Sequence, residues 1–239
     1  MSENRLRKYL EREEVRPEGE LRFKPVVFSD SKGSYLESVC HEEIIGQDIL
    51  WRIFRGGETV FVTQVVRDEL PELVARYGRV HIYLWVGTCD LTAKNGKFVK
   101  LRSNQEEAQR SIVRNVLRLE DEIKQNRKVR LTILQLPYYS IKHWNEYYGH
   151  ENPESFIEND VTSKTSVDVV NGVFEQTNER LRYRAPKFNL DIERTNKAKN
   201  KTTRHSINWG LFKDGIHPDQ LLAKVWLRSI CREILKDCY

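Results

Sequence analysis

Three polar side chains of this sequence could together carry out nucleophilic catalysis. Ser31 lies in the run Ser29-Asp-Ser31, whereas Asp214 and His217 lie three residues apart near the other end of the chain. A serine nucleophile needs a base within hydrogen-bond reach and a third group that orients the base. We therefore predict that Ser31 attacks a substrate, that His217 accepts the serine proton and that Asp214 orients the imidazole.

Two backbone amides are candidates for stabilising the oxyanion of such a reaction. If Ser31 begins a helix, its N–H has no partner within the helix and can bind a negative oxygen. Gly57 has no side chain, so its N–H can approach a substrate closely. Each feature also has a simpler explanation. A Ser-Asp-Ser turn commonly caps a helix, a Gly-Gly pair commonly forms a tight turn, and an Asp three residues before a His often makes only a local hydrogen bond.

Short apolar runs that alternate with longer amphipathic segments must position these residues. Each run has the length of a strand and is rich in β-branched or aromatic residues. The predicted strands are 24–28, 49–54, 80–86 and 129–134, with a weaker fifth at 188–191. The predicted helices are 62–77, 106–125, 167–181 and 218–235. This alternation predicts an α/β fold, a three-layer α/β/α sandwich around a mainly parallel sheet.

The candidate residues follow the ends of the predicted strands. Ser31 follows the first strand, Gly57 the second and Gly87-Thr-Cys-Asp90 the third, while 213–218 directly precedes the last helix. In an open parallel sheet, ligands bind at the carboxyl ends of the strands. The order and placement of these motifs therefore favour a common site over four unrelated turns.

Taken together, the four motifs resemble the conserved blocks of the SGNH (GDSL-like) hydrolase superfamily, over about residues 23–239. Ser29-Asp-Ser31 resembles the block Gly-Asp-Ser, and Gly57-Glu-Thr59 resembles the block that provides an oxyanion glycine. Gly87-Thr-Cys-Asp90 resembles Gly-x-Asn-Asp, and Asp214-Gly-Ile-His217-Pro218 closely matches Asp-x-x-His-Pro. The resemblance implies a flavodoxin-like sheet of about five parallel strands in the order 2-1-3-4-5. It also implies a serine hydrolase, an esterase or acyl hydrolase, that acts on a small acyl ester.

Cys89 departs from the family pattern at an oxyanion position. The resemblance implies an oxyanion hole formed by Ser31, Gly57 and the residue at position 89, where the family has an asparagine amide. A thiol is a weak donor, and loss of one oxyanion donor typically lowers turnover by about 10²–10³. The sequence therefore predicts either a slow hydrolase or a site that has drifted from catalysis to binding. We predict that Cys89 itself is a buried, inert thiol rather than a reactive one.

The alternative function is a catalytically weak or inactive SGNH-like module that binds RNA or another anionic partner. The segment 194–204 has no periodicity and predicts a basic surface loop, with Lys197, Lys199, Lys201 and Arg204 as candidate contacts for nucleic acid. A solvated face is the simpler explanation of such a charge run. The amino-acid sequences of the first and third motifs resemble those of an SGNH-like branch encoded by mobile elements. The complete triad favours the hydrolase, because a binding module needs no triad.

Composition limits the remaining possibilities. The 239-residue chain has a formal net charge of +5 and is 39% hydrophobic, enough for one sizeable core. No apolar run approaches the roughly 18–20 residues that span a bilayer. Residues 1–20 predict a polar leader without the apolar centre of a signal peptide, followed by one domain at 21–239. We therefore expect an intracellular protein, cytoplasmic or nuclear.

No cofactor or metal is predicted. The four cysteines form no Cys-x-x-Cys pair, so neither a zinc site nor a disulfide framework is expected. The five histidines other than His217 lack metal-ligand spacing, and His81, inside a strand, is expected to be structural. The aromatic connection 138–160 predicts an ordered insertion that forms a wall near the pocket, with base stacking as a weaker alternative.

Overall fold

The computed structural model describes residues 1–15, 18–197 and 203–239 of the chain. At its centre lies a sheet of four parallel strands in the order β2-β1-β3-β6. The strands are β1 (Lys24–Ser29), β2 (Leu50–Ile53), β3 (Val80–Trp85) and β6 (Val129–Ile133). The four stronger strand predictions and the order of these strands are therefore confirmed.

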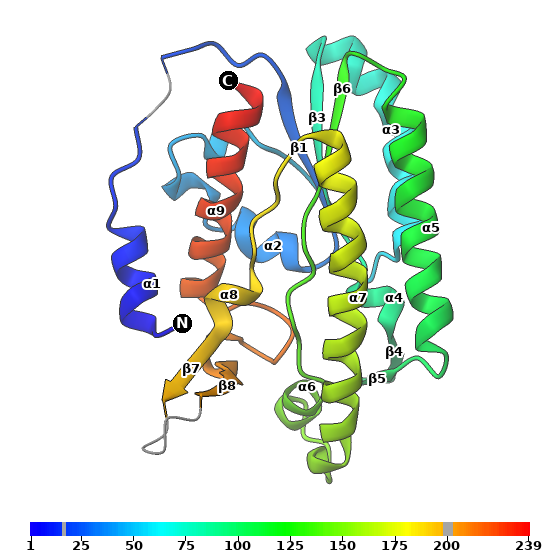
Figure 1. Ribbon diagram of the computed structural model, residues 1–239, viewed down its shortest axis with the longest axis vertical. Coiled ribbons are helices and arrows are strands. Elements are labelled where there is room, and N and C mark those ends of the chain that lie inside the picture. Colours follow the sequence, from blue (N-terminus) through cyan, green and yellow to red (C-terminus); the bar gives the residue numbers. More distant parts are fainter. Residues whose placement is uncertain (16–17, 198–202) are drawn as a thin grey trace.

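Helices cover both faces of the sheet (Figure 1). On one face lie α2 (Lys32–Glu37) and α9 (Gln220–Cys238), and on the other lie α3 (Thr59–Tyr77), α5 (Gln105–Ile123) and α7 (Ile157–Leu181). The fold is thus the expected three-layer α/β/α sandwich. At the start of the chain, α1 (Glu3–Leu10) packs on α9 and buries Leu6 completely.

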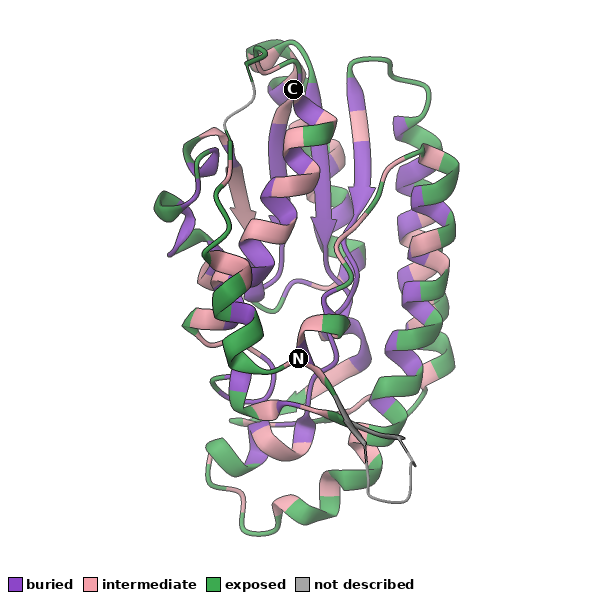
Figure 2. Cartoon of the chain, turned by 60° about the vertical axis from the view of Figure 1, so that its left-hand side comes forward, coloured by how far each residue is buried: buried purple, intermediate pink, exposed green. Residues whose placement is uncertain are grey.

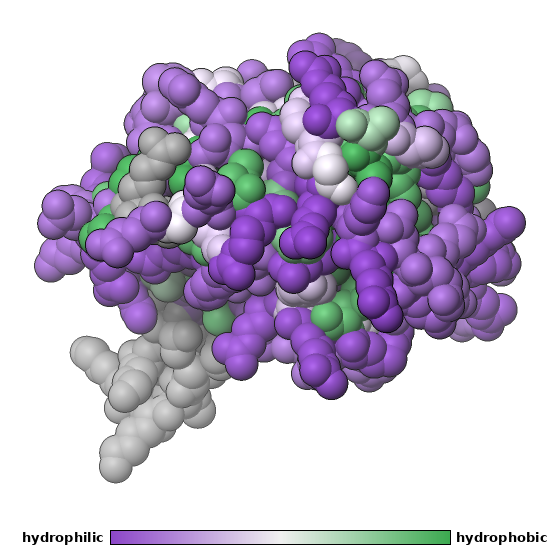
Figure 3. Space-filling view, turned by 90° about the horizontal axis from the view of Figure 1, so that it is seen from above, coloured by the Kyte–Doolittle hydropathy of each residue, from purple (hydrophilic) through white to green (hydrophobic). Residues whose placement is uncertain are grey.

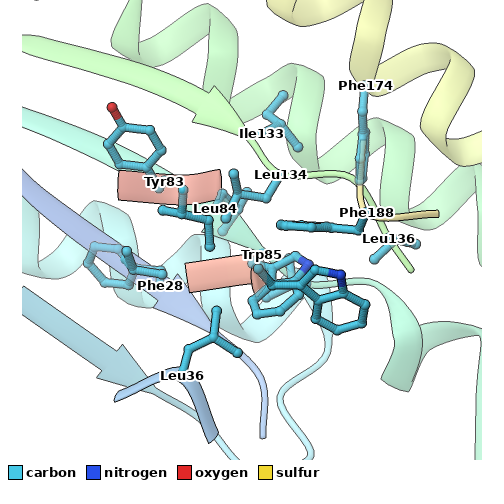
Figure 4. Packing of buried hydrophobic residues seen from close by; sticks show 14 of the residues in the cluster. Phe28, Leu36, Tyr83, Leu84, Trp85, Ile133, Leu134, Leu136, Phe174 and Phe188 are labelled. Atoms are coloured by element: carbon cyan, nitrogen blue, oxygen red, sulfur yellow. The ribbon is translucent and has the colours of Figure 1, made fainter. Parts of the chain in front are cut away.

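Burial on both faces explains why the central strands are almost wholly apolar. All six residues of β3 are buried, and Figure 2 shows buried residues along the central strands and also on the helices that cover them. At the carboxyl end of β3, the ring of Trp85 packs against that of Phe188 (Figure 4). The ring centroids are 5.1 Å apart, and the centroid of Trp226 lies 5.9 Å from that of Trp85. The core therefore extends directly beneath the edge of the sheet where the candidate motifs lie.

The shorter elements lie mainly in the connections at the carboxyl ends of the strands. The helices are α4 (Thr88–Leu91), α6 (Ile141–Tyr147) and α8 (Asn189–Ile192), and the single turns of 3₁₀ helix are η1 (Cys40–Glu42), η2 (Gly46–Asp48), η3 (Pro153–Phe156) and η4 (Trp209–Leu211). Two antiparallel hairpins pair β4 (Thr92–Asn95) with β5 (Phe98–Leu101) and β7 (Glu193–Lys197) with β8 (Thr203–Ile207).

Two sequence predictions are corrected by these elements. The weaker fifth strand at 188–191 is wrong, because this segment forms the helix α8. Phe188 is apolar because it fills a gap between Trp85 and Trp226, not because it belongs to the sheet. The predicted loop at 194–204 begins and ends with strand residues, because its first residues belong to β7 and its last residues belong to β8, which pairs with β7. This pairing is between backbone groups, so an apolar pattern is not needed to form it.

The surface that Figure 3 presents is mainly hydrophilic, with hydrophobic residues in small separate spots. Among the described helices, none is both long enough and apolar enough to cross a bilayer.

Candidate active site

The structure brings together the three residues that the sequence predicts as a triad. Ser31 directly precedes α2 and follows β1, and its Oγ lies 2.8 Å from Nε2 of His217. Nδ1 of the same imidazole lies 2.8 Å from Oδ2 of Asp214. A carboxylate can only accept, so Nδ1 carries the proton and Nε2 presents its lone pair to the serine hydroxyl. This arrangement is suited to removing the serine proton during nucleophilic attack.

The loop that carries Asp214 and His217 is fixed by its own backbone and by α6. Oδ1 of Asp214 accepts hydrogen bonds from the N–H groups of Ile216 at 3.0 Å and His217 at 2.8 Å. Gly215 has a φ of +86°, and a Cβ there would lie 2.7 Å from the carbonyl oxygen of Ser140. The N–H of Ser140 donates to the Gly215 carbonyl at 2.8 Å. The sequence Asp-Gly-x-His therefore supplies both the triad geometry and the close contact with α6.

Asp214 is held in its ionised form. The side chain is buried, and burial by itself acts to raise the pKa of this carboxyl. Hydrogen bonds from the imidazole and the backbone of His217, together with the electrostatic effect of this residue, outweigh burial and lower the pKa of Asp214 below its ordinary value. A negative Asp214 can therefore stabilise the imidazolium that forms when Ser31 loses its proton.

Two aromatic rings fix the plane of the His217 imidazole. Tyr35 of α2 stacks on the imidazole with ring centroids 4.9 Å apart and an interplanar angle of 22°. The ring centroid of Trp144, in α6, lies 5.7 Å from that of His217. The indole N–H of Trp144 donates to the Lys97 carbonyl at 3.0 Å. As expected of the aromatic connection 138–160, Trp144 lines the pocket beside the triad.

The triad opens into a pocket of about 620 Å³ at the carboxyl ends of β1, β2 and β3. This size is typical of sites for small organic ligands. The walls combine Ser31 and His217 with Gly56, Thr88 and Cys89 from the loops after β2 and β3. The motifs that the sequence singled out therefore lie mostly around one cavity.

The structure places Gly56, rather than Gly57, at the pocket. The N–H of Gly57 donates to the Phe54 carbonyl at 2.9 Å, and Gly57 is buried. Gly56 lines the pocket with a φ of +75°. In the described part of the chain, the N–H groups of Ser31 and Gly56 have no acceptor. The turn after β2 determines which of the two glycines lines the pocket. The sequence Gly-Gly alone does not indicate the conformation of this turn.

Cys89 lies half-buried in the pocket wall. Burial, followed by the negative charge of Asp30, raises the pKa of its thiol to about 12. With this pKa the Cys89 thiol is neutral at physiological pH. The side chain is half-buried rather than fully buried as expected, and its inertness stays a prediction. The other three cysteines are buried.

We expect Cys89 of the folded protein to be alkylated by iodoacetamide at pH 8 about 10³-fold more slowly than free cysteine, because only the thiolate reacts. Peptide mapping by mass spectrometry would measure the rate at this residue. The urea-unfolded chain is the control, since all four thiols should then react quickly. Equal rates for Cys89 in the folded and unfolded chains would contradict the raised pKa.

A buried ion pair that the sequence analysis missed joins the first and third motifs. The ammonium of Lys32 lies 2.5 Å from Oδ2 of Asp30 and donates to Oγ1 of Thr88 at 2.9 Å. Lys32 and Asp30 are each only 1% exposed. A lysine is normally expected at the surface, so nothing in the sequence except the Asp-x-Lys spacing could have indicated this pair. Through it, Lys32 ties the residue before the nucleophile to the loop that carries Cys89.

Asp90 links the third motif to the second. Its carboxylate accepts hydrogen bonds from the backbone N–H of Thr59, at 2.9 Å to Oδ2, and from the Thr59 hydroxyl at 2.9 Å. Burial raises the pKa of Asp90 to about 6, against the opposing effect of these bonds. Asp90 therefore caps the first turn of α3 from outside the helix and holds the two loops together.

The remaining candidates of the sequence lie away from the triad or outside the described residues. Lys197 and Arg204 belong to β7 and β8, whereas Lys199 and Lys201 are not described. The nucleic-acid contact therefore stays a prediction. His81 is buried, its Nε2 lies 2.8 Å from Oγ1 of Thr132, and burial lowers its pKa to about 3, as expected of a structural residue. Within the described ranges, no three His, Cys, Asp or Glu side chains cluster to hold a metal ion.

Comparison with known proteins identifies the architecture. No protein-family model and no curated protein sequence matches the chain. Among solved structures, it is similar to a GDSL-like lipase from Bacteroides thetaiotaomicron, with a TM-score of 0.58 and 16% identity over 89% of this chain and 88% of that one. It is also similar to a lipase/acylhydrolase from Enterococcus faecalis, with a TM-score of 0.58 and 14% identity over 91% of this chain and 97% of that one. The chain therefore has the SGNH/GDSL hydrolase fold.

Proposed function

We propose that this protein is a serine hydrolase that cleaves small acyl esters. The observation that carries the proposal is the continuous chain of hydrogen bonds from Ser31 through His217 to Asp214 at the wall of a ligand-sized pocket. The similarity to a GDSL-like lipase and a lipase/acylhydrolase agrees with this chemistry.

The proposed reaction proceeds through an acyl-enzyme. Oγ of Ser31 bonds to the ester carbonyl carbon while its proton passes to Nε2 of His217. The tetrahedral intermediate then breaks the bond to the alcohol, which leaves with the proton from His217. Water, deprotonated by the same imidazole, attacks the acyl-serine, and the acid product leaves as Ser31 recovers its proton. Throughout the cycle, Asp214 remains ionised and orients the imidazole.

The N–H groups of Ser31 and Gly56 are the proposed oxyanion donors. Both lack an acceptor in the described residues, and both residues line the pocket. Cys89 lines the pocket beside them but supplies only a weakly donating thiol. The proposed enzyme is therefore slow in comparison with one that has a third strong donor.

We expect Cys89→Asn to raise kcat by about 10–10², because an amide would add a donor that acts mainly in the transition state. KM should change little for the same reason. Steady-state hydrolysis of 4-nitrophenyl acetate would measure both constants. Cys89→Ala is the matched control and should differ little from the original protein, since it removes only a weak donor. Equal kcat values for the Asn and Ala variants would contradict the proposed role of position 89.

Hydrolysis of 4-nitrophenyl acetate by the purified chain tests the proposed function itself. Two results together would support the acyl-enzyme. The protein should release nitrophenolate faster than buffer alone, and a reaction stopped with acid should contain protein that carries one acetylated serine. Absence of turnover with acetate, propionate and butyrate esters alike would refute the proposal.

A further inference from the structure

The charges around the pocket do not balance. The pocket-lining residues include four basic side chains, of Lys32, Arg55, Lys94 and Arg102, and two acidic ones, of Asp30 and Glu58. Both acids are already paired, Asp30 with Lys32 and Glu58 with Arg102. In the described part of the chain, Arg55 and Lys94 have no carboxylate within ion-pair distance. The unpaired charge of the pocket lining is therefore entirely positive.

The two unpaired cations come from different elements of the pocket wall. Arg55 immediately precedes Gly56 in the turn after β2, and Lys94 lies in β4 of the hairpin that follows α4. Both side chains are exposed, so neither pays a large desolvation cost for remaining charged. The charge of Lys94 acts on the Cys89 thiol and partly offsets the effect of burial on the pKa of that thiol, which shows that Lys94 lies within electrostatic reach of the site.

The pocket has room for more than the acyl group. An acetyl group fills only a small part of about 620 Å³, so the alcohol portion of an ester also fits between the apolar walls formed by Tyr35, Val99 and Trp144. A negative group on that portion would lie in a cavity whose unpaired charges attract it. A positive group would find no unpaired carboxylate among the described lining residues.

We infer that the pocket selects esters that carry a carboxylate or phosphate, which Arg55 and Lys94 bind. This inference rests on the proposed ester hydrolysis and adds the chemical class of the substrate. Arginine binds either anion through two parallel hydrogen bonds, whereas lysine acts as a point charge. Together they attract the anion and orient the ester relative to Ser31.

Three acetyl esters with the same reacting bond test the inference: 3-acetoxybenzoate, its neutral methyl ester and 3-acetoxyphenyl phosphate. The meta position prevents the anion from attacking the ester within the same molecule.

The quantity measured is the ratio of kcat/KM for each anionic ester to that for the neutral one. Arg55→Gln and Lys94→Gln should each lower this ratio about fivefold, the effect of losing one partly exposed ion pair. Added salt should lower the ratio in the original protein but only weakly in the double variant.

Lys97→Gln is the matched control. Lys97 is exposed in the turn between β4 and β5, three residues from Lys94, and does not line the pocket; its substitution should leave the ratio unchanged. A larger loss with 3-acetoxybenzoate than with the phosphate would identify carboxylate as the preferred group, and the reverse would identify phosphate. If all three esters are hydrolysed but Arg55→Gln and Lys94→Gln leave the ratios unchanged, the inference is wrong and the proposed hydrolase activity is not affected. No turnover of any ester would overturn both.

Discussion

Replacing Ser31 with alanine should lower kcat/KM for ester hydrolysis by about 10⁴-fold or more, the scale of losing the nucleophile of a triad. Without Oγ, no acyl-enzyme can form, and the imidazole of His217 loses the hydroxyl that lies 2.8 Å from its Nε2. His217→Ala should cause a loss of similar size, and the double variant should be no worse than either single one, because the two residues act as one unit. Steady-state rates with 4-nitrophenyl acetate would measure all three.

Ser38→Ala is the matched control for this substitution. Ser38 directly follows α2, is exposed and donates its hydroxyl to the Tyr35 carbonyl at 2.7 Å. Its substitution removes the same oxygen atom from the same segment of chain and should leave the rate within about twofold, as is usual for a surface change. Equal rates for the Ser31 and Ser38 variants would mean that hydrolysis, if present, uses another nucleophile.

The second large effect is expected on stability. Lys32→Met should lower the free energy of unfolding by about 3–5 kcal/mol, because it leaves the buried carboxylate of Asp30 without its cation. The Lys32 ammonium lies 2.5 Å from that carboxylate, and both residues are 1% exposed. Thr88 would lose a hydrogen bond at the same time. Urea unfolding followed by circular dichroism would measure the change.

Two further variants distinguish the ion pair from the loss of a long side chain. Lys128→Met removes an exposed lysine and should change the free energy of unfolding by no more than about 0.5 kcal/mol. Asp30→Asn combined with Lys32→Met removes both charges and should recover more than half of the loss, since a neutral pair needs no buried counter-ion. If the double variant were less stable than Lys32→Met alone, burial of the ion pair would not explain the effect.

The fold and the meeting of Ser31, His217 and Asp214 could be predicted from the sequence, because strand patterns and one short loop determine them. The strands β1, β3 and β6 are buried at almost every position and are therefore mainly apolar, most clearly β3, whereas the edge strand β2 is half-buried. Asp214 and His217 are close in sequence, so a single loop gives them their hydrogen bond. Ser31 joins them because the end of β1 and the start of α9 meet at the same edge of the sheet.

The features that the sequence did not reveal depend on contacts between distant segments. Lys32 is buried only because Asp30 and Thr88 together satisfy its ammonium. Gly56 faces the pocket instead of Gly57 because of the turn made after β2. Phe188 lies at the end of a connection and packs in the core beside Trp226. By its sequence, a short apolar run at such a position cannot be distinguished from an edge strand.

Labelling with a fluorophosphonate probe tests the central claim most directly, because it requires an activated serine but no knowledge of the substrate. The protein should gain one phosphonyl group, and peptide mapping should place it on Ser31. His217→Ala, which leaves the hydroxyl in place but removes its base, should abolish labelling at equal probe concentration. Labelling of Ser31 that persists at the same rate in His217→Ala, or a folded original protein that gains no group at Ser31, would contradict a working Ser31–His217–Asp214 triad.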